Sequence, residues 1–178
     1  MDSYNELATA FHRRIESIAA AVDVMAPGLD RATALIVQAV MNDRKILVCA
    51  CGPDRGLAIH LASLLRAPEN SPPLPAIAVV SDVSGEASDG LWRDLRTLSR
   101  DGDVLLSLDT REGADFAALC DQFARERNLG VVALSDANER IAERAVTLAA
   151  TGSDLRSELL LMAAHCLLDR IRQQLLGE

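Results

Sequence analysis

The sequence predicts an α/β fold in which helices cover both faces of a parallel sheet. Short apolar runs of strand length recur along the chain, and helical stretches separate most of them. Strands that are apolar throughout, rather than alternately polar, are typical of parallel sheets buried on both faces. With 178 residues, of which 49% are hydrophobic, we expect a single domain, 1–178. The runs cover residues 46–51, 76–80, 104–108, 131–134 and 145–149.

Two helices are expected before the first run. Apolar residues recur at spacings of three and four from Tyr4 to Met25, which is the stripe of an amphipathic helix. Pro27 and Gly28 are expected to end this helix, and a second one follows. The sheet does not need this helical pair for cover. We therefore expect residues 1–43 to pack against another subunit and residues 44–178 to form the α/β core, with packing of the helices on their own domain as the alternative.

Three further segments are expected from residue type. Residues 68–75 contain four prolines and should be extended. Residues 81–90 are polar, carry two glycines and are predicted to form a loop over the carboxyl ends of the strands, where open α/β sheets bind ligands. A last helix over 153–176 is apolar almost all round from 159 to 168, interrupted by His165. Such a helix lies at the centre of a domain or of a subunit interface.

Composition narrows the classes of partner. A net charge of −8 and a pI near 4.9 argue against a nucleic-acid backbone or an anionic membrane as the main partner. No apolar stretch approaches the ~18 residues that suggest a membrane span, and no signal-peptide pattern is seen, so we expect a cytoplasmic protein. The cysteines are interpreted as buried, reduced thiols; they are Cys49, Cys51, Cys120 and Cys166.

Two strand-to-helix units carry a mismatch. Residues 45–60 and 103–116 each resemble an apolar strand, a tight turn and a helix start, and a helix N-terminus is suited to bind an anion. Yet the turns contain Asp54, Asp109 and Glu112. A carboxylate ~4 Å from a phosphate oxygen disfavours binding by ~4 kcal/mol at an effective dielectric constant near 20. These acids are interpreted as helix N-terminal acids that complement the dipoles, so that the chain's own carboxylates stand where a ligand phosphate would.

Short motifs add a resemblance. The predicted elements follow the order helix–helix–strand–loop–helix. Four features come after them: Pro-Ala-Ile-Ala at 75–78, Ser-Asp-Val-Ser at 81–84, Gly-Asp-Val-Leu-Leu at 102–106 and an acidic residue at the start of the last helix. From about Leu7 to its end, the chain resembles SIS (sugar isomerase) domains, and within them phosphoheptose isomerases and the DnaA-initiator-associating protein. The resemblance implies a flavodoxin-like, three-layer α-β-α sandwich with a five-stranded parallel sheet. It also implies a homotetramer built on the N-terminal helices and a phosphosugar pocket shared between subunits.

The first loop departs from the family pattern. The family has a Gly-Asn-Gly-Gly-Ser-type turn whose serine and backbone hold the phosphate, and residues 50–54 here are Ala-Cys-Gly-Pro-Asp. Only Gly52 is retained. Pro53 has no N–H, and Asp54 replaces a hydroxyl donor by an acceptor.

The second loop departs in the same direction. The family has Ser-Thr-Ser/Arg-Gly-Asn-Ser, and residues 109–114 are Asp-Thr-Arg-Glu-Gly-Ala, which retains Thr110 and Arg111. Arg55 and Arg111 are expected to offset one unfavourable carboxylate, not three. The ligand-binding candidates are Gly52, Asp54, Arg55, His60, Asp109, Thr110 and Arg111.

The catalytic positions are partly retained. The isomerases use a glutamate four residues after a histidine, and here Leu64 follows His60. A second histidine of the family corresponds to His165, which follows Glu158 by seven residues, so His165 and Glu158 are the catalytic candidates. Alternatively, both histidines are core residues. Some isomerases bind a metal with two histidines, the glutamate and a glutamine. Because Leu64 and Ser157 replace the last two, we expect neither zinc nor another cofactor.

Three functions remain open. The first is a carbohydrate-derivative-binding or regulatory oligomer without standard isomerase activity, whose partner is a sugar-phosphate-like ligand or a replication initiator. The second is an isomerase of the sedoheptulose 7-phosphate type with an altered pocket, in which His165 is the acid/base and Arg55 and Arg111 bind the anion. The third is a structural tetramer without a ligand. None involves direct contact with nucleic acid or a membrane, and the sequence leaves open whether the protein is an enzyme.

Overall fold

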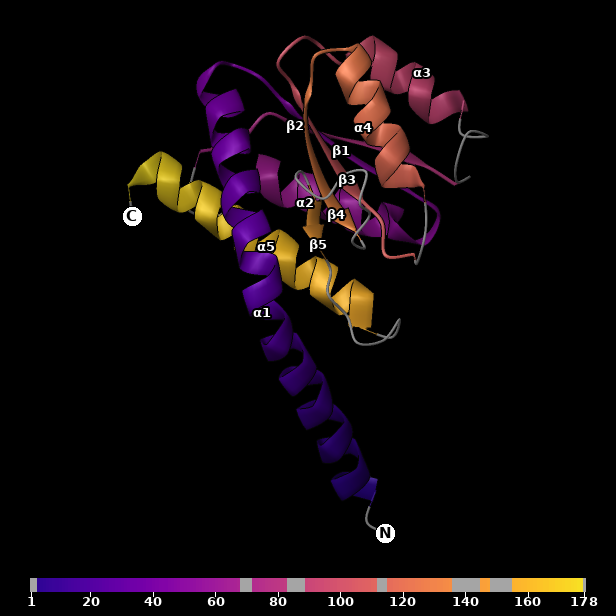
Figure 1. Cartoon of the computed structure of the whole chain (residues 1–178), viewed down its shortest axis with the longest axis vertical. Helices are drawn as coiled ribbons and strands as arrows, with labels where there is room; N and C mark the ends of the chain where they lie inside the picture. The colour runs from indigo at the N-terminus through magenta and orange to yellow at the C-terminus, as the bar shows by residue number, and fades with distance from the viewer. Residues whose placement is uncertain are drawn as a thin grey trace.

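The computed structural model describes residues 3–67, 72–82, 89–111, 115–135, 145–147 and 155–177. A long helix precedes a series of strands and helices that alternate until the last helix (Figure 1). The elements are α1 (Ser3–Met41), β1 (Ile46–Cys51), the 3₁₀ helix η1 (Gly52–Asp54), α2 (Arg55–Arg66), β2 (Ala76–Ser81), α3 (Asp89–Leu98), β3 (Val104–Leu108), α4 (Phe116–Glu126), β4 (Gly130–Ser135), β5 (Ala145–Thr147) and α5 (Arg156–Leu176).

The strands form a parallel sheet in the order β2-β1-β3-β4-β5. Four strands of five or six residues make up most of it, and the three-residue β5 pairs with β4 at one edge. The predicted α/β class with a parallel sheet is confirmed. The chain adds β2 on one side of β1 and β3 on the other. This reversal is the point where open α/β sheets bind ligands, at the carboxyl ends of the strands.

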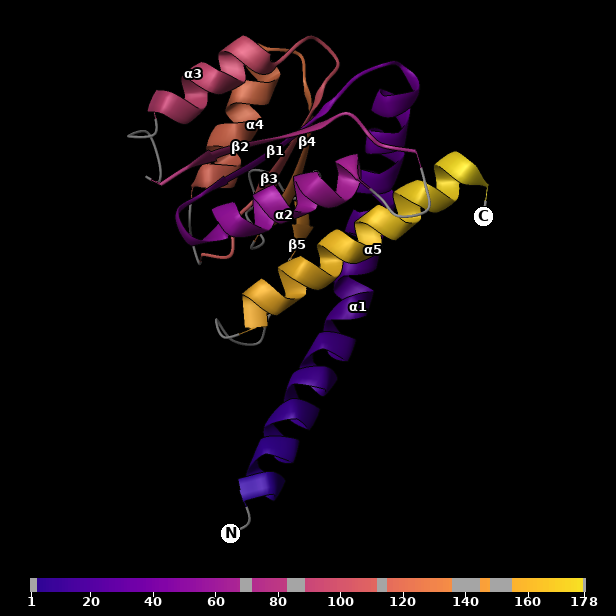
Figure 2. The same cartoon turned by 180° about the vertical axis from the view of Figure 1, so that it is seen from behind.

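Helices cover both faces of the sheet. Alternate side chains of each strand point to opposite faces, so each strand contributes to two core clusters. On β1, Ile46, Val48 and Ala50 belong to one core cluster, together with residues of α1, α2 and α5. Leu47 and Cys49 belong to a second cluster with residues of α3 and α4. Figures 1 and 2 show these two layers from opposite sides. Both faces need apolar side chains, which is why the strands are apolar throughout.

The predicted break at Pro27 is wrong: α1 is one helix from Ser3 to Met41 and contains this proline. A proline inside a helix costs about 3 kcal/mol, since it lacks an N–H and crowds the preceding turn. Buried residues on both sides of Pro27, among them Met25 and Ala32, belong to the same core cluster as α5. Packing of one continuous face therefore outweighs the local preference, and the expected helical pair is a single helix.

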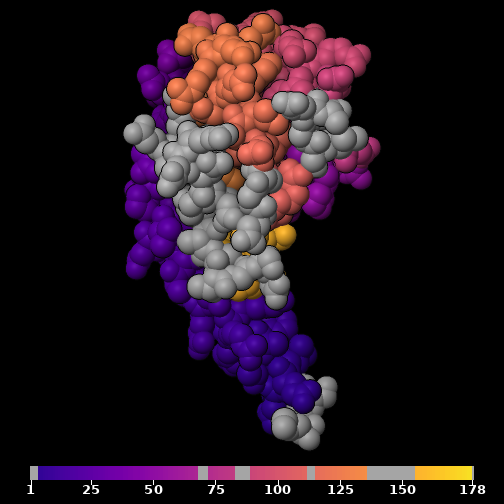
Figure 3. Space-filling model, turned by 45° about the vertical axis from the view of Figure 1, so that its right-hand side comes forward, coloured from indigo at the N-terminus to yellow at the C-terminus, as the bar shows by residue number. Residues whose placement is uncertain are grey.

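The two halves of α1 differ in their surroundings. The second half crosses α5, whereas the first half extends away from the rest of the molecule (Figures 1 and 3). Tyr4 is 73% exposed and Phe11 is 61% exposed, although both belong to the apolar stripe that continues to the buried Met25. The stripe is thus covered within the chain only along its second half.

The proline-rich segment, the polar loop and the last helix were also predicted from residue type. Residues 72–75 are without helix or strand, as predicted for that part of 68–75, and the rest of this segment lies outside the described residues. Within the predicted loop 81–90, Ser81 ends β2 and α3 starts at Asp89, with 83–88 outside the described residues. The last helix is not covered all round, because Leu161 and Met162 are exposed.

The cysteines follow the prediction in part. Cys49, Cys51 and Cys120 are buried free thiols, while Cys166 is free but exposed. Burial raises the pKa of Cys49 and of Cys120, because the apolar surroundings disfavour a thiolate. In the part of the chain that is described, no helix is both long and apolar enough to cross a membrane.

Candidate functional site

Two loops meet at the carboxyl edge of the sheet. β1 and β3 are neighbours, and Ala50 pairs with Leu108 near the ends of both strands. The turn after β1 is therefore beside the residues that follow β3. Gly52, the first residue of that turn, has a φ of 62°, which a glycine adopts without strain. These are the two loops in which the sequence places most of the ligand-binding candidates.

Asp54 joins the loops. Its carboxylate is only 2% exposed and accepts two hydrogen bonds from Thr110: the backbone N–H donates to Oδ2 at 2.9 Å and the hydroxyl to Oδ1 at 2.8 Å. It makes no side-chain capping bond to α2. Asp54 nevertheless is the N-cap residue of α2, which agrees with the interpretation as an acid at a helix N-terminus. Both donors of Thr110, the backbone N–H and the hydroxyl, are thus occupied by a carboxylate of the chain itself.

Asp109 and Arg111 form a second closed unit. The buried Asp109 carboxylate accepts from Arg111 Nε at 2.9 Å and from Nη2 at 3.1 Å, and the backbone N–H of Arg111 donates to it at 3.1 Å. Arg111 Nη2 also lies 3.2 Å from Cys51 Sγ. The hydrogen bond to Asp109 raises the pKa of Arg111. Because α4 starts only at Phe116, Asp109 is not in its first turn, and the interpretation of Asp109 as a helix N-terminal acid is wrong, in contrast to Asp54. Glu112 lies outside the described residues.

The other cations near the loops also have partners. Arg55, the first residue of α2, forms an ion pair with Asp82, which follows β2. Arg156, at the start of α5, donates to the carbonyl of Thr110 over 3.5 Å. The loop edge is therefore tied to its neighbours on β2 and α5. Neither Asp82 nor Arg156 was singled out in the sequence, since no local spacing connects them to the loops.

The two histidines lie together at the surface. His60 on α2 and His165 on α5 have ring centroids 6.1 Å apart with planes inclined by 56°. Both side chains are exposed, so the interpretation as core histidines is wrong. Leu64, one turn after His60, packs against the core cluster instead of presenting a carboxylate. Among the described residues, no three His, Cys, Asp or Glu side chains are grouped to hold a metal ion.

Glu158 lies in the first turn of α5 and forms an ion pair with Arg14 of α1. Both side chains are about half exposed, at 40% and 49%. No local spacing indicates this partner, because Arg14 lies 144 positions earlier in the chain. The retained glutamate is therefore held by the long helix, within the half of that helix whose apolar stripe is exposed.

Trp92 has a structural position. Its ring lies 6.2 Å from that of Phe116 and 5.8 Å from that of Phe123, between α3 and α4. These contacts make the half-buried Trp92 part of the packing between the two helices and the sheet.

Comparison with known proteins gives consistent relatives over the full length. No family model matches the chain. Phosphoheptose isomerase of Halorhodospira halophila is 34% identical, and the alignment covers 99% of this chain and 98% of the relative. The structure of a phosphoheptose isomerase from Francisella tularensis has a TM-score of 0.78 at 22% identity, covering 97% of this chain and all (100%) of the other. A HobA–DnaA complex from Helicobacter pylori has a TM-score of 0.64 at 13% identity, with coverage of 99% and 97%.

Proposed function

The chain belongs to the phosphoheptose isomerase family, and within this family we propose that it is a binding or regulatory oligomer that does not perform the standard isomerisation. It acts in the cytoplasm on a protein partner or on a carbohydrate derivative that lacks a full phosphate. The observation that carries this proposal is the pair of hydrogen bonds between Asp54 and Thr110.

Asp54 makes the first loop unsuited to a phosphate. A sugar phosphate that used the Thr110 donors would have to displace a buried carboxylate, or sit beside it. At ~4 Å and an effective dielectric constant near 20, two negative charges repel by ~4 kcal/mol, which corresponds to roughly a thousandfold in affinity. Nearby donors do not compensate for this repulsion. Pro53 has no backbone N–H, and the ionised side chain of Asp54 has no donor.

The arginines of the site do not restore the balance. Arg111 is bound in a two-pronged contact by Asp109, and Arg55 is paired with Asp82. A ligand phosphate would have to compete with these carboxylates for both guanidinium groups. Arginine–carboxylate and arginine–phosphate pairs are both charge-assisted, so a phosphate gains from each arginine only what the displaced carboxylate loses.

The proton-transfer step lacks a group as well. Moving a proton between two adjacent sugar carbons requires a base beside the sugar. The position one turn after His60 holds Leu64, which packs on the core. His165 and Glu158 are retained, yet Glu158 is paired with Arg14. This arrangement supports a protein that has kept the scaffold and given up the reaction.

The direct test is titration of the full chain with sedoheptulose 7-phosphate. We expect no saturable heat by calorimetry and no shift in melting temperature at millimolar ligand, because ligand binding would raise the melting temperature. The Halorhodospira halophila relative serves as the positive control. Binding at micromolar concentration with conversion to a heptose phosphate would contradict the proposal.

A pair of variants locates the cause. Asp54→Ser replaces the carboxylate by a hydroxyl donor and should improve binding of the sugar phosphate by at least about tenfold. Asp115→Ser is the matched control, since Asp115 is an exposed residue before α4 that makes no capping bond. Equal behaviour of the two variants would show that Asp54 is not what excludes the phosphate.

We also propose that the chain assembles through the first half of α1, as a homotetramer. The exposed stripe of Tyr4, Leu7, Phe11 and Ile15 continues directly into the part of α1 that is buried in the core. A second copy that covered it would gain about 1.5–3 kcal/mol for each large apolar side chain. Glu158 is paired with Arg14 of this half, so a neighbouring copy would also lie beside Glu158.

Light scattering after size exclusion tests the assembly. Phe11→Asp should yield a smaller species than the tetramer expected for the unchanged chain. Thr9→Asp, which places the same charge on the opposite side of the helix, should leave the tetramer intact. A monomeric unchanged chain, or equal masses for the two variants, would contradict this assembly.

A replication initiator is the protein partner to test first. A neighbour of the same fold, HobA, was solved in complex with DnaA. Purified DnaA from the same cell should be retained by the immobilised full chain, whereas an unrelated acidic protein of similar size should not. Without retention, and without response to sugar phosphates, the interpretation as a structural tetramer remains.

The second candidate function is an isomerase with an altered pocket. It is favoured by one observation: His60 and His165 lie together on α2 and α5. In this case a His165→Gln variant should lose turnover of a sugar substrate while retaining the fold. Turnover by the unchanged chain is the result that would separate this candidate from the first.

A further inference from the structure

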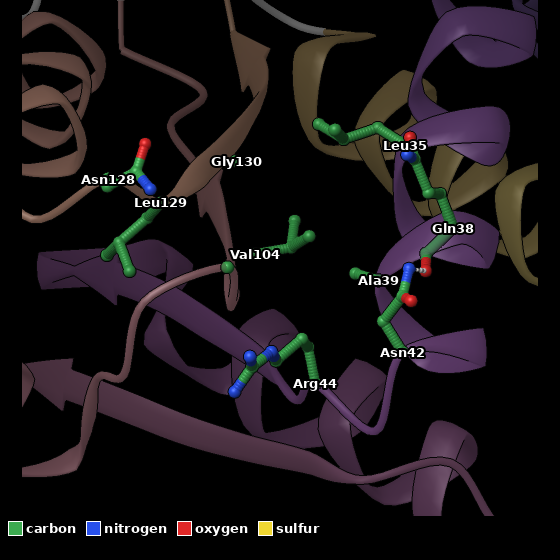
Figure 4. A pocket seen from close by; sticks show the side chains of 10 residues that line it. Leu35, Gln38, Ala39, Asn42, Arg44, Val104, Asn128, Leu129 and Gly130 are labelled. Atoms are coloured by element: carbon green, nitrogen blue, oxygen red, sulfur yellow. Dashed lines mark hydrogen bonds between the residues drawn. The ribbon is translucent and has the colours of Figure 1, made fainter.

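A hollow of about 410 Å³ lies at the amino edge of the sheet, at the opposite ends of the strands from the loops described above. Its walls come from the last turns of α1 and from the starts of β3 and β4 (Figure 4). Pockets for small molecules have volumes of roughly 300–1,000 Å³. This hollow is therefore large enough for a small organic molecule.

Its floor is apolar. Leu35 and Ala39 of α1 face Val104 of β3 and Leu129, which precedes β4 (Figure 4). Gly130 makes this packing achievable: a Cβ there would lie 3.2 Å from both terminal carbons of Leu35 and 3.3 Å from Val104 Cγ2. The floor is thus made by side chains packed closely against a glycine, and it offers a surface for an apolar ligand body.

Its rim is polar and carries one cation. The amides of Gln38, Asn42 and Asn128 line it together with Arg44 (Figure 4). The stem of Arg44 lies on Gly102, where a Cβ would come within 3.1 Å of Nε. The guanidinium of Arg44 points away from Gln38 and Asn42, toward the strand side of the hollow. Among the described residues it has no ion pair or hydrogen bond, in contrast to Arg55 and Arg111.

We propose that this hollow is a binding site for a small carboxylate with a short apolar body, with Arg44 binding the carboxylate and the floor taking up the body. A planar guanidinium offers two parallel N–H donors that match a carboxylate. This site lies apart from the carboxyl-edge loops, and its existence does not depend on the function proposed for them.

The surrounding charges select a monoanion. Asp43 and Asp101 are exposed near the rim, and Asp101 accepts a hydrogen bond from the Asn128 amide. A dianion would meet twice the repulsion from these acids with the same single guanidinium. The C-terminal end of α1 adds little repulsion, because the Ala39 carbonyl already accepts the N–H groups of Asn42 and Arg44.

Nuclear magnetic resonance of the ¹⁵N-labelled full chain tests the site with hexanoate as the probe. We expect saturable shifts of the amide signals of Gly102, Gly130 and Asn128 in the millimolar range. Hexanamide, which has the same body without the charge, should bind about tenfold more weakly. Inorganic phosphate, which has no apolar body, should give no saturable shift at these amides.

Variants identify the cation. Arg44→Gln should weaken hexanoate binding about tenfold, and Arg44→Lys, which keeps the charge but loses the two-pronged contact, should fall between. Arg93→Gln on the exposed side of α3 is the matched control and should bind like the unchanged chain. Amide signals of residues away from the hollow should be the same in each variant as in the unchanged chain, which verifies the fold of the variants.

Three results would overturn the proposal. The first is the absence of a saturable hexanoate shift at these amides. The second is equal binding by the Arg44→Gln and Arg93→Gln variants, and the third is binding of hexanamide or phosphate as strong as that of hexanoate. Since none of these measurements uses a sugar phosphate, their failure leaves the function proposed for the carboxyl edge untouched.

Discussion

Each of the two edges of the sheet contains a buried carboxylate with several hydrogen-bond donors, but the edges differ in whether their arginines are paired. At the carboxyl edge, Asp54 accepts two hydrogen bonds from Thr110. At the amino edge, Asp103 is 1% exposed, accepts the N–H groups of Lys45 at 3.0 Å and Arg100 at 2.7 Å, and pairs with the Lys45 ammonium. Each carboxylate joins two segments that are distant in the sequence.

This similarity indicates that the buried acids of this fold connect separate segments of the chain, which is a structural role. Asp103 sits where no family ligand is expected, and its bonding is as complete as that of Asp54. The difference lies in the cations. At the carboxyl edge Arg55 and Arg111 are both paired, whereas at the amino edge Arg44 has no partner among the described residues. At the edge that family membership would mark as the binding site, both arginines are thus paired with acids of the chain itself.

The largest expected effect is at Asp103. Asp103→Ala should lower the free energy of unfolding by about 3–5 kcal/mol, because it leaves the Lys45 ammonium and two backbone N–H groups without their acceptor. Urea unfolding followed by circular dichroism measures the change. Asp101→Ala, in the same turn but exposed, is the control and should cost less than about 1 kcal/mol. If both variants lose the same stability, Asp103 does not have this structural role.

Asp54→Ala should follow, with a loss of about 2–3 kcal/mol, because two donors of Thr110 lose a charged acceptor. Asp54→Asn keeps an acceptor oxygen and should lose about 1 kcal/mol. Asp115→Ala, before α4, should change the stability by less than about 0.5 kcal/mol. A loss at Asp54 no larger than at Asp115 would mean that the loops are not held by this carboxylate, and the comparison of the two edges would fail.

The buried thiols beneath the paired charges should make the stability of the protein depend on pH. Burial raises the pKa of Cys49 and Cys120, so the folded chain keeps two thiol protons that the unfolded chain loses above a pH of about 8.5. Their contribution to stability is complete below that pH and is lost as the pH rises. The slope is about 1.4 kcal/mol per pH unit for each thiol.

Urea unfolding under reducing conditions between pH 8 and 9.5 measures this slope. Cys120→Ala should roughly halve it, whatever the variant does to stability at neutral pH. Cys166→Ser is the control, since Cys166 is exposed and should leave the slope unchanged. A flat profile for the unchanged chain would mean that these thiols are not held neutral by burial.

Sequence patterns could predict the parts of this structure that depend on local chemistry. Apolar runs marked the strands because both faces of the sheet are covered, and the two turns could be placed because each follows such a run. The family resemblance supplied the expectation of a sandwich. The break at Pro27 failed because a local preference was outweighed by packing of α1 on both sides of the proline.

Side-chain partners could not be predicted. The acids of the two turns were visible in the sequence, but Thr110 lies 56 positions after Asp54, and Arg14 lies 144 positions before Glu158. Such partners are chosen by strand order and helix crossing, which leave no local spacing. The alternative that His60 and His165 are core residues failed, because the placement of α2 beside α5 leaves both at the surface. Arg44 was not singled out because a lone arginine after a helix has no distinguishing pattern.

The smallest expected effect compares neighbouring cations at the amino edge. Arg44→Gln should change the free energy of unfolding by less than about 0.5 kcal/mol, because Arg44 has no charged partner to lose among the described residues. Lys45→Gln should cost about 1–3 kcal/mol, since it removes the ion pair to the buried Asp103. Urea unfolding of the two variants at one pH provides the measurement. If Arg44→Gln were as destabilising as Lys45→Gln, Arg44 would be a structural residue, and the two edges would no longer differ in having an arginine without a charged partner among the described residues.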